Sequence, residues 1–174
     1  MIETARLQLS PLEPERDAAF ILRLLNEPSW LRFIGDRGVR TLDDARAYIV
    51  NGPQASYREN GFGLYRVSLR DGGDVIGLCG LIKRPTLPHI DIGFAFLPEH
   101  WRQGYAFEAA RAAVDDGVRR HQLQSLAAIT APDNIGSIRV VEKLGLRLQE
   151  RIVMPGQTAE TLLFVGDLSP HRID

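Results

Sequence analysis

The stretch over residues 94–106 has the residue types and spacing that most directly suggest chemistry. An apolar, strand-like run ends there in a polar loop, which contains Gly104 and leads straight into a helical pattern. The first turn of a helix has unpaired backbone N–H groups and a partial positive charge. The junction is therefore suited to binding phosphate, with Gly104 allowing close approach and Arg102 adding a cation. A bare Arg-Gln-Gly triplet would by itself favour an ordinary strand-to-helix connection with a solvated arginine, and it is the surrounding residues that favour a phosphate site.

Two common phosphate-binding motifs are missing from the chain. A Walker loop requires Gly-Lys followed by Ser or Thr, and a dinucleotide-binding fingerprint requires three spaced glycines. Neither pattern occurs in the 174 residues. The sequence therefore disfavours both P-loop and Rossmann chemistry.

The N-terminal half predicts two helices followed by three strands. Thr41, followed three residues later by Asp44, forms a capping-box-like start for the second helix. Short turns separate the strand-like runs, which favours an antiparallel meander. The expected elements are an edge-like strand over 6–9, helices over 14–26 and 41–57, and strands over 62–69, 74–82 and 89–96.

The C-terminal half predicts a long helix, a strand, a short helix and a final hairpin. A strand, a long helix and another strand form a crossover, which makes the two strands parallel. The expected elements are helices over 104–120 and from 134 to 144, and strands over 126–130, 146–154 and 161–168. We expect one α+β domain over residues 1–174, built on a mixed sheet.

Composition and charge exclude several classes of protein. Lys and Arg number 21 and Asp and Glu number 22, so the net charge of −1 provides no electrostatic footprint for nucleic acid. Hydrophobic residues at 44% and charged residues at 25% are typical of a folded globular protein. No apolar run approaches the roughly 20 residues that cross a bilayer, and the first residues lack the features of a secretory signal. We expect a cytoplasmic protein with no nucleic-acid or membrane partner.

Metal and thiol chemistry are also disfavoured. The chain has one cysteine, Cys79, and its four histidines lie at no metal-ligand spacing. Cys79 lies in the apolar run 75–82 with no base beside it, which is typical of a small core residue rather than a nucleophile. The sequence therefore predicts no bound metal and no nucleophilic cysteine.

Four segments, in order and together, resemble one family. Residues 4–12 look like its opening strand, and residues 91–94 look like its fourth strand. Residues 101–106 are similar to its pyrophosphate loop, Gln/Arg-x-x-Gly-x-Gly/Ala, at the fourth and sixth positions, and differ at Trp101. Residues 134–146 are similar to its Asn-x-x-Ser helix followed by Gly-Phe. The chain thus resembles the GNAT superfamily of acetyl-CoA-dependent N-acetyltransferases, in particular the RimJ/RimL branch that acetylates ribosomal-protein N-termini.

The resemblance implies the acyl-CoA N-acyltransferase fold. Its sheet is mixed, mostly antiparallel, seven-stranded and flanked by helices, and its fourth and fifth strands splay apart to hold the pantetheine arm of acetyl-CoA. A bulge near residues 94–96 would aim one N–H at the thioester carbonyl, where an oxyanion develops. The implied cofactor-binding residues are Phe96 and Leu97 for the pantetheine amides, Asn134 for the other side of the arm, and the N–H groups of Arg102, Gln103, Gly104, Tyr105 and Ala106 for the pyrophosphate.

Attack on a thioester requires a neutral amine, so a proton acceptor is expected. The resemblance implies Asp91, which lies on the presumed fourth strand, where many members place a carboxylate that acts through water. Glu160 from the last hairpin and His89 are alternatives. The alternative for Asp91 and for Glu160 is a solvated carboxylate with no part in the reaction.

The leaving thiolate needs a proton or a hydrogen bond. Many members supply it from a Tyr seven residues after the Asn, but here that position is Val141. The RimJ/RimL branch has a Ser three residues after the Asn, and Ser137 matches it, which implies a hydroxyl facing the sulfur. The alternative is that Ser137 only supports the first turn of its helix.

The resemblance implies transfer of acetyl from acetyl-CoA to a primary amine in a ternary complex, the acceptor being a protein N-terminal α-amine or a small-molecule amine. A non-catalytic acyl-CoA-binding or sensing module, and an interaction module without the cofactor cleft, are the alternatives. The segment 28–57 is expected to cover the acceptor, and polyamines are disfavoured because it has no acidic cluster beyond Asp43 and Asp44. We expect a monomer, or a homodimer through the edge of the last hairpin.

Overall fold

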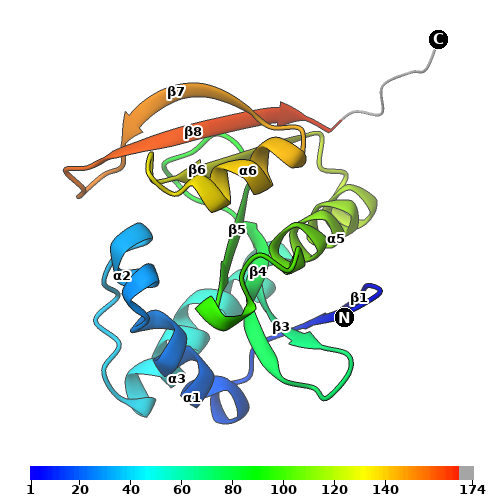
Figure 1. Ribbon diagram of the computed structural model, residues 1–174, viewed down its shortest axis with the longest axis vertical. Coiled ribbons are helices and arrows are strands. Elements are labelled where there is room, and N and C mark those ends of the chain that lie inside the picture. Colours follow the sequence, from blue (N-terminus) through cyan, green and yellow to red (C-terminus); the bar gives the residue numbers. More distant parts are fainter. Residues whose placement is uncertain (169–174) are drawn as a thin grey trace.

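The computed structural model describes residues 1–168 as an eight-stranded sheet flanked by helices (Figure 1). The strands are β1 (Ile2–Glu3), β2 (Leu7–Ser10), β3 (Leu64–Leu69), β4 (Val75–Ile82), β5 (Asp91–Phe96), β6 (Ser125–Thr130), β7 (Arg147–Val153) and β8 (Glu160–Asp167). The helices are α1 (Pro14–Leu25), α2 (Pro28–Phe33), α3 (Leu42–Ile49), the π-helix η1 (Val50–Gln54), α4 (Ala55–Asn60), the 3₁₀ turn η2 (Pro98–His100), α5 (Tyr105–His121) and α6 (Ile135–Lys143).

The strands are arranged in the order β1-β2-β3-β4-β5-β6-β8-β7. Every neighbouring pair is antiparallel except β5 and β6, which are joined through α5 and run parallel. The expected α+β class, mixed sheet and crossover are therefore confirmed. The expected number of seven strands is corrected to eight, because β1 pairs with β2 and moves β2 away from the edge. A two-residue strand is too short to show an alternating pattern in the sequence.

Strands β5 and β6 are paired only at one end. Asp91 faces Ala127, whose N–H donates to the Ile90 carbonyl over 2.9 Å, and no further residue pair joins the two strands. Toward Phe96 the strands diverge. The expected splay is confirmed, and it leaves one side of the second half of β5 without a strand partner.

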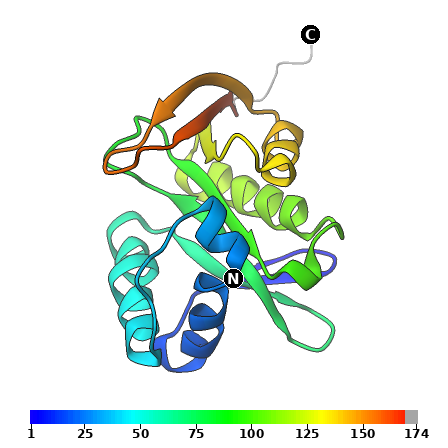
Figure 2. The same ribbon diagram turned by 60° about the vertical axis from the view of Figure 1, so that its left-hand side comes forward.

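Two hydrophobic cores cover the two faces of the sheet. On one face, α5 contributes Ala109, Ala110 and Ala113, whose small side chains allow the helix to lie close to the strands. On the other face, α1, α2 and α3 surround Leu78 of β4. Figure 2 shows α1 and α3 on one side of the sheet and α5 on the other. None of the helices within residues 1–168 is long and apolar enough to cross a membrane.

The segment expected as one helix over 41–57 divides into α3, η1 and α4. Its start is confirmed, because the Thr41 side chain accepts a hydrogen bond from the Asp44 N–H and the Asp44 side chain accepts one from the Thr41 N–H. The π-helical turn contains Pro53, which has no N–H to donate to the preceding turn. The short helix α2, in the segment taken as a link, was not expected.

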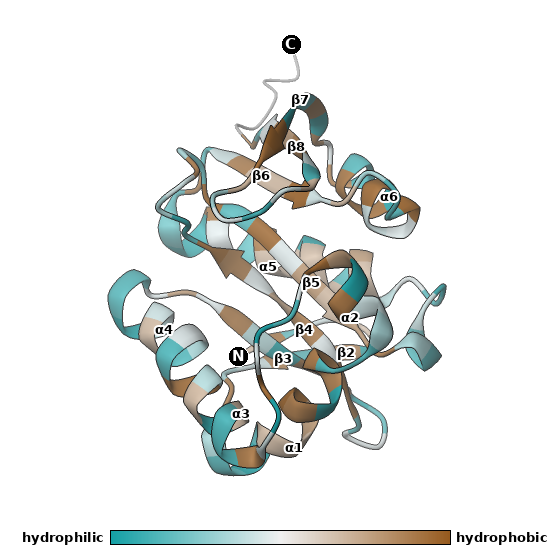
Figure 3. Ribbon diagram, turned by 90° about the vertical axis from the view of Figure 1, so that its left-hand side faces the viewer, coloured by the Kyte–Doolittle hydropathy of each residue, from teal (hydrophilic) through white to brown (hydrophobic). Residues whose placement is uncertain are grey.

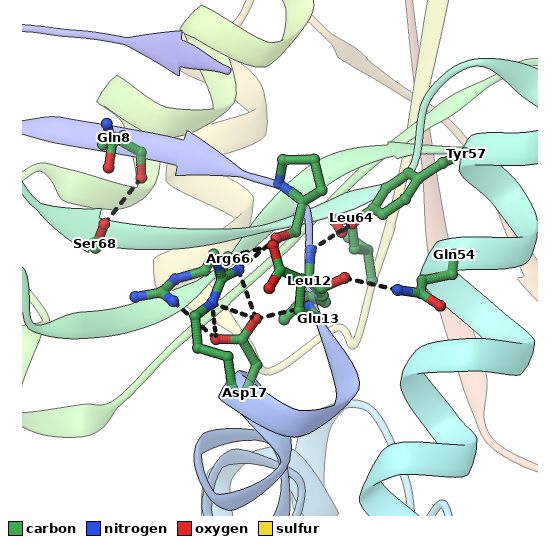
Figure 4. A network of polar contacts seen from close by, with 11 residues as sticks. Gln8, Leu12, Glu13, Asp17, Gln54, Tyr57, Leu64, Arg66 and Ser68 are labelled. Atoms are coloured by element: carbon green, nitrogen blue, oxygen red, sulfur yellow. Dashed lines mark hydrogen bonds and ion pairs between the residues drawn. The ribbon is translucent and has the colours of Figure 1, made fainter.

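A polar network anchors this helical layer to the sheet (Figure 4). Asp17 of α1 is 1% exposed and accepts hydrogen bonds from Arg16 over 2.8 Å and from Arg66 of β3 over 2.9 Å. The Tyr57 hydroxyl of α4 accepts from the Leu12 N–H and donates to the Leu64 carbonyl. These bonds fix the helices that form one wall of the cleft described below.

Candidate active site

The loop before α5 has the backbone geometry expected of an anion-binding turn. Gly104 is the N-cap residue and has φ +81°, while Arg102 has φ +60°, a conformation that few non-glycine residues adopt. No side chain caps the helix, so its first N–H groups remain for a ligand. Arg102 is exposed and forms no ion pair within residues 1–168. The backbone from Arg102 through Gln103 and Gly104 to Tyr105 and Ala106 therefore fits a pyrophosphate.

Arg6, from the turn before β2, fastens this loop to the body of the protein. Its Nη1 donates to the Gln103 carbonyl over 2.9 Å, and its guanidinium lies 4.5 Å from the centre of the Tyr105 ring. Its Nε and Nη2 contact Glu108 of α5 at 2.7 and 2.6 Å, and the Thr4 hydroxyl donates to the same carboxylate over 2.6 Å. Burial raises the pKa of Glu108, but these bonds outweigh burial and the net shift is downward.

Trp101, which departs from the family's loop pattern, has a clear structural role. Its indole Nε1 donates to the Phe96 carbonyl over 2.8 Å at the end of β5. Leu97 donates its N–H to the Ile76 carbonyl of β4 over 2.9 Å and is only 2% exposed. Of the two residues expected to pair with pantetheine, Phe96 thus retains a backbone N–H for that purpose and Leu97 does not.

The register of β5 shows which N–H groups are open to a ligand. In an antiparallel ladder, alternate residues direct their N–H and C=O groups to the same neighbouring strand. Because Leu97 is bonded to β4, the N–H groups of Phe94 and Phe96 point toward β6, which has already diverged. The pairing of β4 with β5 has no register shift, so the bulge expected near 94–96 is absent. Ordinary alternation presents Phe94 N–H to the opening without one.

A cleft of about 1030 Å³ lies next to this opening. Its wall includes residues from α2 to α4, from β5, from the end of β6 with α6, and from the β7–β8 hairpin. Asp91, Asn134, Ser137 and Glu160 all line it. The structure thus brings the candidate catalytic residues to one cavity, while Phe96, Leu97 and the loop over 101–106 lie outside its lining.

Asp91 is a buried carboxylate with one cationic partner. Its side chain is 1% exposed, and Arg84 Nε lies 3.0 and 3.2 Å from its two oxygens. Burial raises the pKa of Asp91, Arg84 opposes the shift, and the resulting pKa is about 6. A carboxylate with such a pKa is ionised at neutral pH and is a stronger base than a solvated one.

The two alternative bases differ in position. Glu160 lines the cleft, but it is exposed and forms an ion pair with Arg151 at 3.1 Å. His89 Nδ1 lies 3.1 Å from the Ser125 hydroxyl, and neither residue lines the cleft. Asp91 is therefore the candidate whose environment differs most from that of a solvated side chain.

The start of α6 distinguishes the two interpretations of Ser137. Asn134 is the N-cap, and its side-chain oxygen accepts a hydrogen bond from the Ser137 N–H over 3.2 Å. The hydroxyl of Ser137 makes no hydrogen bond within residues 1–168 and lies at the cleft wall. The helix start is therefore stabilised by Asn134, and the Ser137 hydroxyl is free to meet a ligand. Asn134 retains its NH₂ group for the same purpose.

Two other sequence expectations concern buried residues. Cys79 is fully buried, and burial raises its pKa, which makes it unreactive as expected. Val141, one turn after Ser137, is 1% exposed at the base of the cleft. Within residues 1–168 no group of three or more His, Cys, Asp or Glu side chains could hold a metal ion.

Comparison with known proteins decides the family. Residues 6–147, which include the loop, β5, β6 and α6, match the family model described as an acetyltransferase (GNAT) domain. The chain belongs to the GNAT acetyltransferase family. GNAT acetyltransferases use acetyl-CoA, and the loop before α5 together with the splayed strands is the part of this acetyltransferase that fits it.

Individual relatives agree with this assignment. The acetyltransferase is 32% identical over 146 residues to the uncharacterized N-acetyltransferase YnaD of Bacillus subtilis (strain 168), covering 84% of this chain and 82% of YnaD. An acetyltransferase structure from Agrobacterium tumefaciens str. C58 superimposes with a TM-score of 0.78 at 26% identity, over 95% of this chain and 92% of that one. Mycobacterium smegmatis RimJ in complex with CoA-disulfide shares the fold, with a TM-score of 0.78 at 19% identity over 93% and 82% of the chains.

Three contacts of this acetyltransferase were missed by reasoning from sequence. The contacts of Arg6 with Glu108 join residues 102 positions apart, and no local pattern predicts them. Arg84, which contacts Asp91, lies in a turn whose composition indicates only a connection between strands. Only the bond from Trp101 to the Phe96 carbonyl had a signal in the sequence. An indole N–H that follows closely after a strand can donate a hydrogen bond to the last carbonyl of that strand.

Proposed function

We propose that this acetyltransferase transfers the acetyl group of acetyl-CoA to a primary amine, a protein N-terminal α-amine or a small-molecule amine, within a ternary complex. The observation that carries the proposal is that Asp91 and Ser137 line one cleft, which lies beside the opening between β5 and β6. Asp91 provides a base on the acceptor side, and Ser137 provides a hydroxyl on the side of α6. The Phe94 N–H, three residues after Asp91 on β5, faces the opening.

These groups suffice for direct transfer. Asp91 takes the proton of the ammonium, directly or through a water molecule, and the neutral nitrogen forms a bond to the thioester carbonyl carbon. The Phe94 N–H stabilises the negative charge that develops on the carbonyl oxygen. The carbon–sulfur bond then breaks, and the Ser137 hydroxyl hydrogen-bonds to the departing sulfur, which takes up one proton from solvent through that hydroxyl and leaves as the thiol. The second amine proton and the proton held by Asp91 pass to solvent, so that one proton is released in each turnover.

An acceptor screen tests the proposal. The purified chain is incubated with acetyl-CoA and, separately, with peptides of different first residues, small-molecule amines and a polyamine, and thiol release is measured with and without each acceptor. The proposal expects amine-dependent release from at least one peptide or small amine, with mass spectrometry showing the acetyl group on its nitrogen. Binding of CoA without amine-dependent release would instead indicate a sensing module.

A further inference from the structure

The wall of the cleft that Asp91 lines is rich in cationic side chains. Two of them have partners, since Arg32 contacts Asp133 at 2.8 Å and Arg84 contacts Asp91. The other two, Arg37 and Lys83, form no ion pair within residues 1–168 and are exposed. The cationic residues that line the cleft are Arg32, Arg37, Lys83 and Arg84.

Arg84 uses only part of its guanidinium to bind Asp91. The Nε atom makes both contacts with the carboxylate, and the terminal nitrogens Nη1 and Nη2 make no hydrogen bond within residues 1–168. The Arg84 side chain is 28% exposed, and Arg84 lines the cleft. Arginine can bind a carboxylate or phosphoryl group through two parallel N–H donors.

Tyr48 of α3 belongs to the same part of the wall. Its hydroxyl makes no hydrogen bond within residues 1–168. Burial raises the pKa of Tyr48, and the positive charges of Arg37 and Arg84 partly oppose that shift. Arg37, Tyr48 and Arg84 all line the cleft that Asp91 also lines. Together the three side chains supply hydrogen-bond donors and positive charge to that cleft.

The acidic residues of the cleft do not cancel this charge. Asp91 is paired with Arg84, and Glu160 is paired with Arg151. Glu59, exposed on α4, is the remaining acidic residue that lines the cleft. Two unpaired cations therefore stand against one unpaired carboxylate, which disfavours a polycationic acceptor and favours one with a negative charge.

We propose that the acceptor carries a carboxylate close to its amine, which Arg37, the terminal nitrogens of Arg84 and the Tyr48 hydroxyl bind while the amine meets Asp91. The inference rests on the proposed function, because it places the amine at Asp91. The same chemistry has two sources. One is a small amino acid or similar zwitterion, and the other is a peptide whose N-terminal residue is followed by an acidic side chain.

Matched acceptor pairs test the proposal. Alanine and alaninamide represent the small-molecule source, and two peptides that begin Ala-Glu and Ala-Gln represent the peptide source. For each acceptor, kcat/KM is measured with the wild type and with Arg37→Gln. Differences in amine basicity cancel, because each acceptor is compared with itself in the two enzymes. We expect Arg37→Gln to lower kcat/KM about 10-fold more for the carboxylate than for its amide in one pair, as loss of a charge-assisted hydrogen bond would do.

Arg111→Gln is the matched control, because Arg111 forms an exposed ion pair with Asp115 on the outer face of α5 and does not line the cleft. It should change both members of each pair equally. A coupling below twofold in both pairs would overturn the inference. If no acceptor is acetylated, the affinities of the same four acceptors are measured by calorimetry in the presence of CoA. Tighter binding of the carboxylate than of its amide, lost in Arg37→Gln, would support the anionic binding site and overturn the proposed function. Equal affinities for carboxylate and amide would overturn both.

Discussion

The Ser137 hydroxyl is accessible from the cleft and has no structural role. The bond that starts α6 uses the Ser137 backbone N–H and the Asn134 side chain. Removing the hydroxyl therefore leaves the cap intact. The stability of the protein and its turnover should respond very differently to this change.

We expect Ser137→Ala to lower kcat by about 10- to 10⁴-fold, the smaller figure for a lost hydrogen bond and the larger for lost acid catalysis. The KM for acetyl-CoA should change little, and the free energy of unfolding should change by less than about 0.5 kcal/mol. Steady-state kinetics and thermal unfolding measure the three quantities. A variant with normal kcat would show that the hydroxyl has no part in the reaction.

Asp91 should determine the acidic limb of the pH–rate profile. Its raised pKa of about 6 means that the base form accumulates as the pH rises through 6, so kcat/KM should increase across that range. Asp91→Asn should lower kcat/KM by about 10²- to 10⁴-fold and remove this limb, leaving only the rise that follows deprotonation of the acceptor amine.

Thermal unfolding provides the structural control for Asp91→Asn. Because the pKa of Asp91 is raised in the folded state, its ionisation favours the unfolded state, and its contribution to stability declines as the pH rises from about 4 to 6. At pH 8 the Asn variant should therefore melt no lower than the wild type. A wild-type profile without a limb near pH 6, or one that Asp91→Asn retains, would assign the base to another group.

The sequence indicated the residues near the chemistry better than their partners. Asp91, Asn134 and Ser137 were expected from the resemblance to GNAT acetyltransferases, and the structure brings them to one cleft. The contact of Arg84 with Asp91 and the accessibility of the Ser137 hydroxyl depend on side-chain positions that no local pattern encodes. Burial, which sets the pKa of Asp91, is likewise a property of the packed sheet and not of the strand.

At the scale of elements, the loop before α5 depends on a distant strand. Arg6 and Thr4 contact the Glu108 carboxylate one turn into the helix, and Arg6 also contacts the Gln103 carbonyl. The loop is thus held from one side by side chains that precede β2. This support matters because Arg102 has φ +60°, a conformation that is unfavourable for a residue other than glycine.

Glu108→Gln should loosen this arrangement, because it removes the charge that binds Arg6. We expect the KM for acetyl-CoA to rise about 10-fold with kcat nearly unchanged, since the acetyl end lies at the cleft and not at the loop. The loss of stability should be about 1 kcal/mol, because Arg6 is 47% exposed and the ion pair is partly screened by solvent. Asp115→Asn, which removes an exposed ion pair of the same helix, is the control. An unchanged KM would show that the loop holds its shape without Arg6.

Elements with strong periodicity were predictable and short ones were not. The capping box at Thr41 and the long helix α5 follow directly from the residue pattern. Helix α2 has six residues, too few for a helical stripe, and its Trp30 anchor becomes visible only when it packs on α1 and α3. The π-helical turn results from Pro53 within an otherwise continuous helix, where local chemistry indicates an interruption but not its form.

At the scale of the whole molecule, the site lies where two halves of the sheet separate. Figure 3 shows β6 to β8 with α6 in the upper half and α1 to α4 in the lower half. The cleft is lined from both halves, and the ion pair of Arg32 with Asp133 joins them across 101 positions of the chain. A ligand that occupies the opening between β5 and β6 would contact both halves and should stabilise the fold as a whole.

Thermal unfolding with and without CoA tests this central claim most directly. A ligand that binds only the folded state at 100 times its Kd adds about 2.7 kcal/mol, which for a chain of this size corresponds to roughly 5–10 °C in Tm. We predict a rise of this order at millimolar CoA for the wild type. Gly104→Val should abolish the rise, because a branched side chain at φ +81° would distort the loop and occupy the phosphate space. A wild-type Tm that does not change with CoA would contradict the assignment of the loop and of the opening between β5 and β6.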